Sequence, residues 1–288
     1  SSSSGCSTSK QLDHLEREMT SDTKTIDQFL AENPDVDVSH AWERCWGILS
    51  DIKQQIALRF PGLQPEPNCE DRAYYTSPNG EFEGSMQAWS GPGCDWLVNS
   101  WLGNRKASIL DMNATAFLGQ ESDVPHFVMV FGTIPKLFFY FDFTPRRNLM
   151  VDTDYLDRYY GVINEEYLEL RGNPAFQWSV SHGTYMRALT NPSTQSLMGD
   201  LSEENISIFE AYAYRMLEHW SGWLDAATPV PEAGRTALRD YDFRVRELGY
   251  ARDPMNKLAE QVFGADQVDT MLNIRMGREQ MQRRLREN

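Results

Sequence analysis

The 288-residue chain contains 41% hydrophobic, 24% charged and 12% aromatic residues, a composition that supports a folded core and excludes collagen-like, coiled-coil and wholly disordered chains. Acidic residues outnumber basic ones by 42 to 27, so the net charge is −15. Because proteins that bind nucleic acid neutralise phosphates with Lys and Arg, we expect no nucleic-acid partner. No apolar run exceeds five residues, whereas a membrane-spanning helix needs about 20. We therefore expect a soluble globular protein that is not transmembrane.

The two ends of the chain differ from its middle. Residues 1–38 start with a serine-rich stretch and continue as a polar segment with a possible helix, so we interpret them as a processed or flexible N-terminal segment. Residues 39–288 are expected to form a single domain. At the other end, residues 272–288 carry five arginines against two glutamates. Such a basic segment suits either an acidic partner or the solvated face of a terminal helix.

Cofactor and metal signatures are absent from the sequence. The four cysteines, Cys6, Cys45, Cys69 and Cys94, are far apart and include neither CxxC nor histidine at zinc-ligand spacing. The chain also lacks GxGxxG, GxxxxGK[ST], GxSxG and HExxH motifs. We therefore expect no bound cofactor and no metal. So few cysteines also favour a reducing compartment over a disulfide framework.

The first strongly patterned element is a helix over about 39–60, whose apolar residues recur every three or four positions. A loop rich in Pro and Gly follows at 63–80. Five aromatic and β-branched segments separated by short turns are predicted to be strands, at about 82–90, 95–102, 107–117, 126–132 and 136–143. Connections this short join antiparallel strands, because a parallel crossover needs a dozen or more residues.

The second half of the chain is predicted to be mainly helical. A short helix from Thr153 to Tyr160 precedes a segment, 171–198, that we expect to be irregular. Four further helices are expected at about 202–225, 232–248, 254–262 and 266–285. A block of antiparallel strands with helices before and after it indicates the α+β class, built as a layered sheet.

Several motifs occur in an order and spacing that resemble one known family. They are Pro78-Asn79-Gly80, Asp95-Trp96-Leu97-Val98, Pro125-His126-Phe127-Val128, the segment FDFTPRRNLMVDTDYLDRYY at 141–160, and Tyr185-Met186-Arg187. Through them the chain is similar, over most of its length, to the red chlorophyll catabolite reductase family within the ferredoxin-dependent bilin reductases. The resemblance implies an α/β/α three-layer sandwich, in which helices flank a central antiparallel sheet on both faces.

The resemblance also implies an activity, the reduction of an open-chain tetrapyrrole derived from chlorophyll, of the red chlorophyll catabolite type. Single electrons come from reduced ferredoxin, and no cofactor is bound. A chloroplast or plastid location, in the stroma or at the thylakoid, and a possible homodimer are implied as well. Two alternatives stay open. One is a non-catalytic tetrapyrrole-binding protein or pigment-complex subunit with the same fold, and the other is a relative that acts on a different conjugated substrate.

Stepwise reduction of such a pigment requires a positioned proton donor. The family uses an Asp that matches Asp253 here, and a Glu on the central sheet whose place is taken by Val130, which cannot donate a proton. His126 and His182 are the substitutes that the sequence offers. Asp253 has a second interpretation, because an Asp before Pro also begins a helix as its N-cap.

Binding the pigment requires cations for its propionates and apolar walls for its rings. The candidate substrate-binding residues, taken from matched motifs and strand positions, are Arg187, Arg146, Thr190, Val130, Trp101 and Phe139. The two aromatic residues among them have a second interpretation as core packing, which is the more common role of such residues. Because ferredoxins are acidic, docking further requires a basic patch. Its candidates are Lys106, Lys136, Arg146, Arg147 and the C-terminal arginines.

Overall fold

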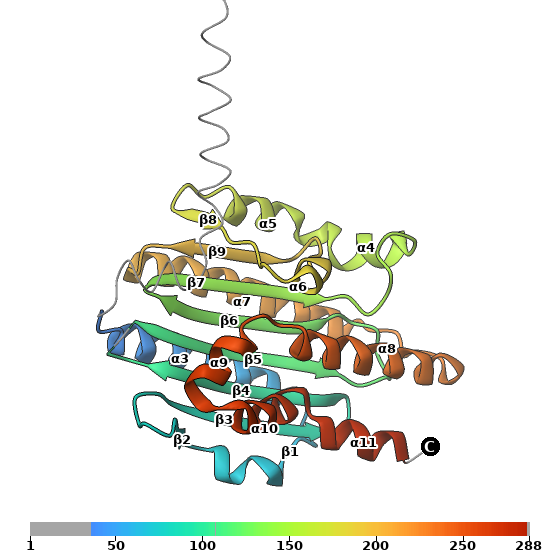
Figure 1. The fold of residues 1–288 in the computed structure, drawn as a ribbon. Helices are drawn as coiled ribbons and strands as arrows, with labels where there is room; N and C mark the ends of the chain where they lie inside the picture. The colour runs from blue at the N-terminus through green and yellow to red at the C-terminus, as the bar shows by residue number, and fades with distance from the viewer. Residues whose placement is uncertain (1–35, 107, 287–288) are drawn as a thin grey trace, which may run out of the picture.

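One antiparallel sheet organises the part of the chain that the structure, a computed structural model, describes: residues 36–106 and 108–286. The strand order is β1-β3-β4-β5-β6-β7-β9-β8, and β2 pairs with β3 (Figure 1). The strands are β1 (Gln64–Pro65), β2 (Tyr75–Thr76), β3 (Glu83–Gly91), β4 (Cys94–Asn104), β5 (Ile109–Leu118), β6 (His126–Ile134), β7 (Lys136–Thr144), β8 (Phe176–Trp178) and β9 (Gln195–Gly199). The five consecutive strands predicted between 82 and 143 are confirmed as β3 to β7, and all are paired antiparallel.

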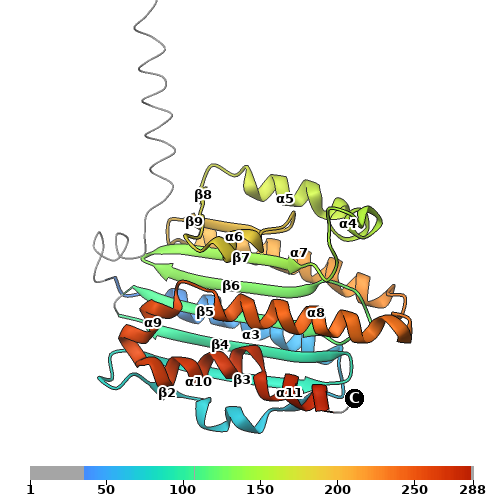
Figure 2. The same cartoon turned by 45° about the vertical axis from the view of Figure 1, so that its right-hand side comes forward.

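Helices cover both faces of the sheet, so the predicted three-layer sandwich of the α+β class is confirmed. In Figures 1 and 2, α3 and α7 lie on one face, and α8 to α11 lie on the other, together with α6. The helices are α3 (Ser39–Leu58), α4 (Thr153–Tyr159), α5 (Asn164–Arg171), α6 (Thr184–Ala188), α7 (Glu203–Asp225), α8 (Glu232–Ala251), α9 (Asn256–Phe263), α10 (Ala265–Met276) and α11 (Arg278–Arg286). None of the described helices is long and apolar enough to cross a membrane.

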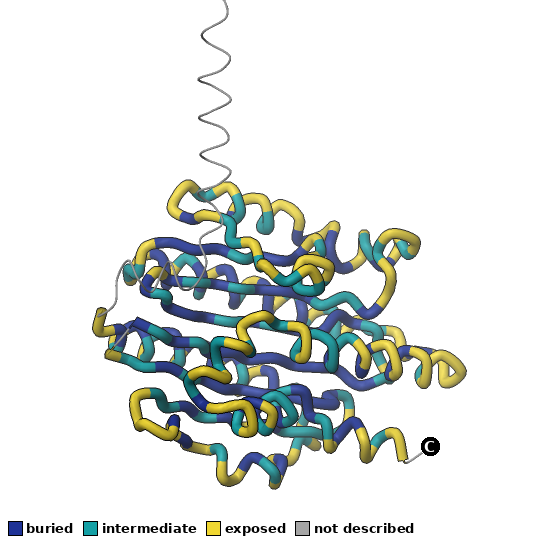
Figure 3. The backbone as a smooth tube through the Cα atoms, in the orientation of Figure 1, coloured by how far each residue is buried: buried dark blue, intermediate teal, exposed yellow. Residues whose placement is uncertain are grey.

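The larger core lies between the sheet and the layer formed by α3 and α7. Most alternate residues of β6 and β7 on this face are buried phenylalanines: Phe127, Phe131, Phe139, Phe141 and Phe143. One of them, Phe139, stacks on Phe209 of α7 with ring centroids 4.4 Å apart. Burial follows the layers, because the strands are mostly buried while the outer helix faces and loops are exposed (Figure 3). This core holds the sheet rigidly, so side chains on its other face are positioned for a site.

Two expectations about the second half are wrong. The segment 171–198, expected to be irregular, contains β8, α6 and the start of β9, and β9 pairs with β7 at the edge of the meander. The helix expected over 266–285 is broken at Gly277, whose φ of +65° is left-handed. A Cβ at Gly277 would lie 2.6 Å from the Trp96 ring, so only glycine fits this left-handed position at the end of α10. The possible helix within residues 1–35 lies outside the described residues.

Candidate functional site

The candidate site is a part of the sheet that the second helical layer leaves incompletely covered. Near the middle of β6 and β7, four side chains on the face opposite α3 and α7 are only half-buried, although these strands are internal to the sheet. They are Val128, Val130, Phe138 and Tyr140, and we call them the open strip. In Figure 2 these strands run between α8 on one side and α6 on the other. A mainly apolar surface of this kind suits the flat rings of a conjugated ligand.

Asp253 reaches this region from the turn that joins α8 to α9. Its Oδ1 accepts a hydrogen bond from the backbone N–H of Met255 at 2.9 Å, so the carboxylate does organise the turn. Burial nevertheless raises the pKa of Asp253, against the effects of that hydrogen bond and of Arg275. Its charge also acts on Tyr140 of the open strip. Asp253 is therefore not the N-cap of α9, which begins at Asn256 after Met255, but a residue of the preceding turn with the pKa direction of a proton donor.

Helix α6 borders the same turn. A Cβ on Gly183, just before α6, would lie 3.0 Å from Cδ of Pro254, which shows how closely the two segments approach. Arg187 is exposed on this helix and donates through Nη1 to the carbonyl oxygens of Ser181 at 2.9 Å and His182 at 3.0 Å. His182 and Thr190 are exposed as well. The structure thus gathers these three predicted residues at the margin of the site rather than on the open strip.

Asn113 of β5 provides a polar group next to Val130, its partner in the sheet. The side chain is buried, and its Nδ2 donates to Oγ of Ser100 at 2.8 Å. Its Oδ1 accepts no hydrogen bond from the residues that the structure describes. Burying an amide oxygen without a hydrogen-bond donor costs about 1–3 kcal/mol of folding free energy. An N–H group of a bound ligand is therefore a suitable partner for it.

Sequence reasoning missed Asp142 of β7, which lies on the same face of the sheet as Val128, its partner on β6. Its carboxylate is buried and accepts hydrogen bonds from Thr144, Asn191, Ser193 and Thr194. Burial raises the pKa of Asp142 to about 6 despite these bonds. The sequence did contain a sign of this residue: in Phe141-Asp142-Phe143, a single acidic residue lies between two phenylalanines of a predicted strand.

The structure gives Arg146 and His126 a different position from the one expected. The Arg146 side chain is fully buried and pairs with Asp242 of α8, with Nη2 2.6 Å from Oδ2, and it also donates to three backbone carbonyls. His126 accepts at Nδ1 from the N–H of Leu118, and its Nε2 lies 3.2 Å from Oδ1 of Asp242. We call Arg146, His126 and Asp242 the anchor cluster. Arg146 therefore has no free donors for a propionate, and burial lowers the pKa of His126.

Trp101 and Phe139 lie on the face of the sheet that the site does not use. Trp101 packs edge-on against Trp42 of α3 with ring centroids 5.1 Å apart, and Phe139 stacks on α7. The structure therefore does not bring them to the open strip, and both belong to the larger core. Val130 is the one predicted binding residue on the strip itself.

This assignment of faces predicts opposite effects for two substitutions. Val130→Trp is expected to weaken pigment binding by covering the open strip while changing the unfolding free energy little, because the Val130 side chain is only half-buried. Phe139→Leu is expected to lower the unfolding free energy by about 1–2 kcal/mol without changing pigment affinity, because it loosens a packed core. Denaturant unfolding and absorbance titration with biliverdin measure the two quantities. Weaker binding by Phe139→Leu with unchanged binding by Val130→Trp would contradict the assignment.

Three of the five C-terminal arginines attach the last two helices to the rest of the fold. Arg275 lies 3.7 Å from Asp111, Arg283 bonds the buried Glu66 at 2.9 Å, and Arg284 lies 3.3 Å from the buried Asp95. These contacts occupy much of the basic segment. The idea that it is merely a solvated face is therefore wrong for these residues.

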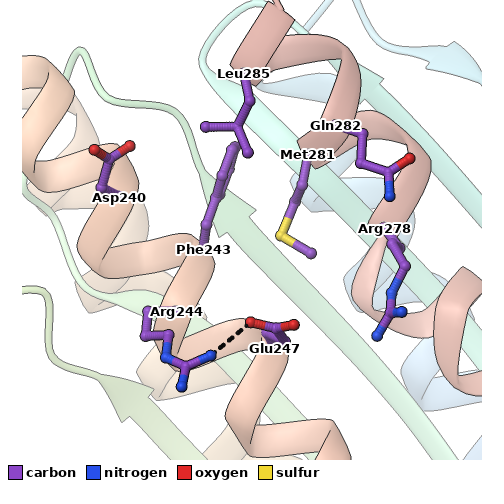
Figure 4. A pocket seen from close by; sticks show the side chains of 8 residues that line it. All are labelled: Asp240, Phe243, Arg244, Glu247, Arg278, Met281, Gln282 and Leu285. Atoms are coloured by element: carbon purple, nitrogen blue, oxygen red, sulfur yellow. Dashed lines mark hydrogen bonds and ion pairs between the residues drawn. The ribbon is translucent and has the colours of Figure 1, made fainter.

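A cavity of about 360 Å³ lies on the outer side of α8, between this helix and α11 (Figure 4). Phe243, Met281 and Leu285 line it, and Arg244 pairs with Glu247 at its margin at 2.9 Å. None of the open-strip residues and neither Asp253 nor Asp142 lines it. Within the described residues, no group of three His, Cys, Asp or Glu side chains could hold a metal ion.

Comparison with known proteins agrees with this architecture. The crystal structure of tomato phytochromobilin synthase in complex with biliverdin superposes with a TM-score of 0.71, covering 80% of this chain and 82% of that one at 16% identity. At this identity the similarity establishes the fold. No curated protein matches in a sequence search. A sequence profile of red chlorophyll catabolite reductase (RCC reductase) matches residues 47–219, more than half of the chain. The chain therefore belongs to the red chlorophyll catabolite reductase family and is an oxidoreductase.

Proposed function

We propose that this protein reduces an open-chain tetrapyrrole derived from chlorophyll, of the red chlorophyll catabolite type, with electrons supplied one at a time by reduced ferredoxin. Family membership and the fold shared with a bilin-binding synthase support tetrapyrrole reduction in general. The observation that carries the proposal to this site is Asp253, an acid with a raised pKa placed beside the open strip. By the same reasoning we propose a plastid location, where ferredoxin and chlorophyll breakdown coincide.

The chemistry follows from what each part of the site offers. The open strip supplies an apolar floor for the pyrrole rings, and the buried Oδ1 of Asn113 is a suitable acceptor for a pyrrole N–H. Arg187, at the margin, is the candidate partner for a propionate. Each two-electron reduction consumes two electrons from two ferredoxin molecules and two protons. Asp253 is the candidate donor of one of these protons, because its raised pKa keeps it protonated at a higher pH than an ordinary aspartate.

One observation favours a second candidate, a tetrapyrrole-binding protein without activity. Val130 occupies the position where the family resemblance places its Glu, and valine has no proton to give. If no other group replaces that acid, the pigment binds but is not reduced.

The test uses the protein with red chlorophyll catabolite or biliverdin under anaerobic conditions. Absorbance titration first measures binding, and reduced ferredoxin with a regenerating system is then added. Loss of the long-wavelength band together with a new product supports the reductase. A shifted spectrum that electrons do not change supports the binding protein. Absence of any spectral change with either pigment contradicts both. Reduction of biliverdin but not of red chlorophyll catabolite would contradict the proposed substrate while leaving tetrapyrrole reduction in place.

A further inference from the structure

Tyr140 lies directly opposite Val130 in the sheet. The two residues are paired between β6 and β7, so their side chains leave the same face at neighbouring positions. The Tyr140 side chain is half-buried on the open strip, and burial, with a contribution from Asp253, holds its pKa well above the usual value. A hydroxyl group that keeps its proton at all physiological pH values therefore stands beside the position where an acid is missing.

Asp142, two residues further along β7, is a buried carboxylate surrounded by neutral donors. Its Oδ1 accepts from Nδ2 of Asn191 at 2.5 Å, from Oγ1 of Thr194 at 3.0 Å and from Oγ of Ser193 at 3.4 Å, and its Oδ2 accepts from Oγ1 of Thr144 at 2.8 Å. Among the described residues, no Lys, Arg or His forms an ion pair with it. A carboxylate desolvated in this way takes up a proton more readily than one at the surface.

Thr194 lies near both groups. Its hydroxyl donates to Oδ1 of Asp142 at 3.0 Å, and against the larger effect of burial Thr194 lowers the pKa of the Tyr140 phenol. A hydroxyl group can donate one hydrogen bond and accept others, so it can pass a proton by exchanging the one it holds. Asp142, Thr194 and Tyr140 thus form a chain that runs from the buried interior of the site to the open strip, and we call it the relay.

We propose that Tyr140 donates a proton to the bound tetrapyrrole in place of the acid missing at Val130, and that Asp142 returns the proton through Thr194. The inference rests on the proposed function, because the reaction it serves is reduction of the pigment. It gives the site two proton donors on opposite sides of the ligand: Tyr140 from the sheet and Asp253 from the helical layer.

The step balances as follows. Reduced ferredoxin transfers one electron to the pigment and is itself oxidised, which leaves a pigment radical anion. The O–H bond of Tyr140 breaks and its proton forms a new bond to the pigment. The pigment becomes a neutral radical and Tyr140 a phenolate. Thr194 then protonates the phenolate and receives a proton from the carboxyl group of Asp142. A second ferredoxin electron and a proton from Asp253 complete the two-electron reduction, and the carboxylates regain protons from solvent.

A purely structural role is the competing explanation, because the same hydrogen bonds hold the loop at 191–194 against β7. The two explanations differ in pH dependence. Of the titratable groups that face Asp142, Tyr140 and Tyr160 have raised pKa values and stay neutral, and His126 lies further along β6 with a lowered pKa. Asp253 is the other carboxyl group near the relay, and an Asp142 variant retains it. The difference between the wild-type and variant pH profiles therefore isolates Asp142.

The experiment combines four variants with biliverdin or red chlorophyll catabolite, whichever the wild type reduces, and reduced ferredoxin. Tyr140→Phe is expected to slow product formation by about 100-fold while binding the pigment, with a pigment radical accumulating in electron paramagnetic resonance spectra. Asp142→Asn and Thr194→Val are expected to slow it by about 10-fold, and Thr194→Ser, which keeps the hydroxyl, retains the wild-type rate. The wild-type rate falls as the pH rises through about 6, whereas the Asp142→Asn rate loses that dependence.

Thermal unfolding of each variant shows whether it is folded. Turnover by Tyr140→Phe at the wild-type rate overturns the proposal while leaving the proposed function intact. A wild-type pH dependence retained in Asp142→Asn, or equal rates for Thr194→Val and Thr194→Ser, overturns the part assigned to Asp142 and Thr194. If the wild type binds the pigment and never reduces it, the proposed function and the relay both fail.

Discussion

Replacing Asp253 with asparagine is expected to lower pigment reduction by about 10²–10⁴-fold, the range typical for loss of a general acid. The side-chain oxygen of asparagine can still accept the N–H of Met255, so the turn before α9 and pigment affinity are expected to persist. Only the proton is lost. In the wild type, burial raises the pKa of Asp253. Turnover is therefore expected to fall as the pH rises through this raised pKa, because the carboxyl group then loses its proton. Single-turnover absorbance measurements test both expectations.

Asp266→Asn is the matched control, because Asp266 is an exposed aspartate in the first turn of α10. It is expected to retain the wild-type rate. Full activity of Asp253→Asn would mean that the carboxylate serves only to organise the turn before α9. Loss of pigment affinity together with activity would instead indicate that the turn itself has changed.

Removing the buried cation of the anchor cluster is expected to have the largest effect on stability. Arg146→Met leaves the Asp242 carboxylate buried without its main partner, and breaking one side of such a pair costs about 3–5 kcal/mol of unfolding free energy. Arg147→Met is the neighbouring control. Its side chain is 42% exposed and pairs with Asp123, a type of contact that contributes at most about 1 kcal/mol. Denaturant unfolding of both variants makes the comparison, and equal losses would contradict the role of the cluster.

The anchor cluster also predicts how stability depends on pH. Although burial opposes it, Arg146 and His126 hold the pKa of Asp242 below its usual value, so this carboxylate contributes stability that is lost as the pH falls through its folded pKa. Burial lowers the pKa of His126, so the unfolded chain takes up a proton there first, and stability also falls below about pH 6.5. Both groups therefore weaken the fold in acid. Between pH 7 and pH 5 the contribution of His126 decreases, whereas buried carboxyl groups with raised pKa values, such as Asp142, act in the opposite direction. We therefore expect the wild type to lose unfolding free energy relative to His126→Gln as the pH falls from 7 to 5.

Local patterns in the sequence account for much of the fold. The strands β3 to β7 follow from aromatic and β-branched runs with short turns, and α3, α7 and α8 follow from helical periodicity. The strand β9 does not, because its partner β7 lies about 50 residues earlier and nothing local marks the pairing. The break between α10 and α11 at Gly277 was not predicted either, because a glycine alone does not end a helix. The close approach of the Trp96 ring, which leaves no space for a Cβ at Gly277, is visible only in the tertiary structure.

The candidate site divides in the same way. Asp253 and Val130 were candidates from the sequence because the family resemblance points to their positions. Asp142 lies inside the best-matched segment, 141–160, but its significance depends on Asn191, Ser193 and Thr194, which only the pairing of β9 with β7 brings near it.

The sequence by itself determined the α+β class and the five central strands, because these depend on periodicity and on residues close together in the chain, and the resemblance of its motifs indicated the family. Only the tertiary structure decided which face of the sheet each strand residue occupies relative to the two helical layers. Alternation tells which side chains share a face, but not which layer covers it, and so Trp101 and Phe139 lie in the core. The position of the Arg146 side chain also depends on the tertiary structure. Its partner Asp242 is 96 residues away and pairs with it only after α8 has packed on the sheet.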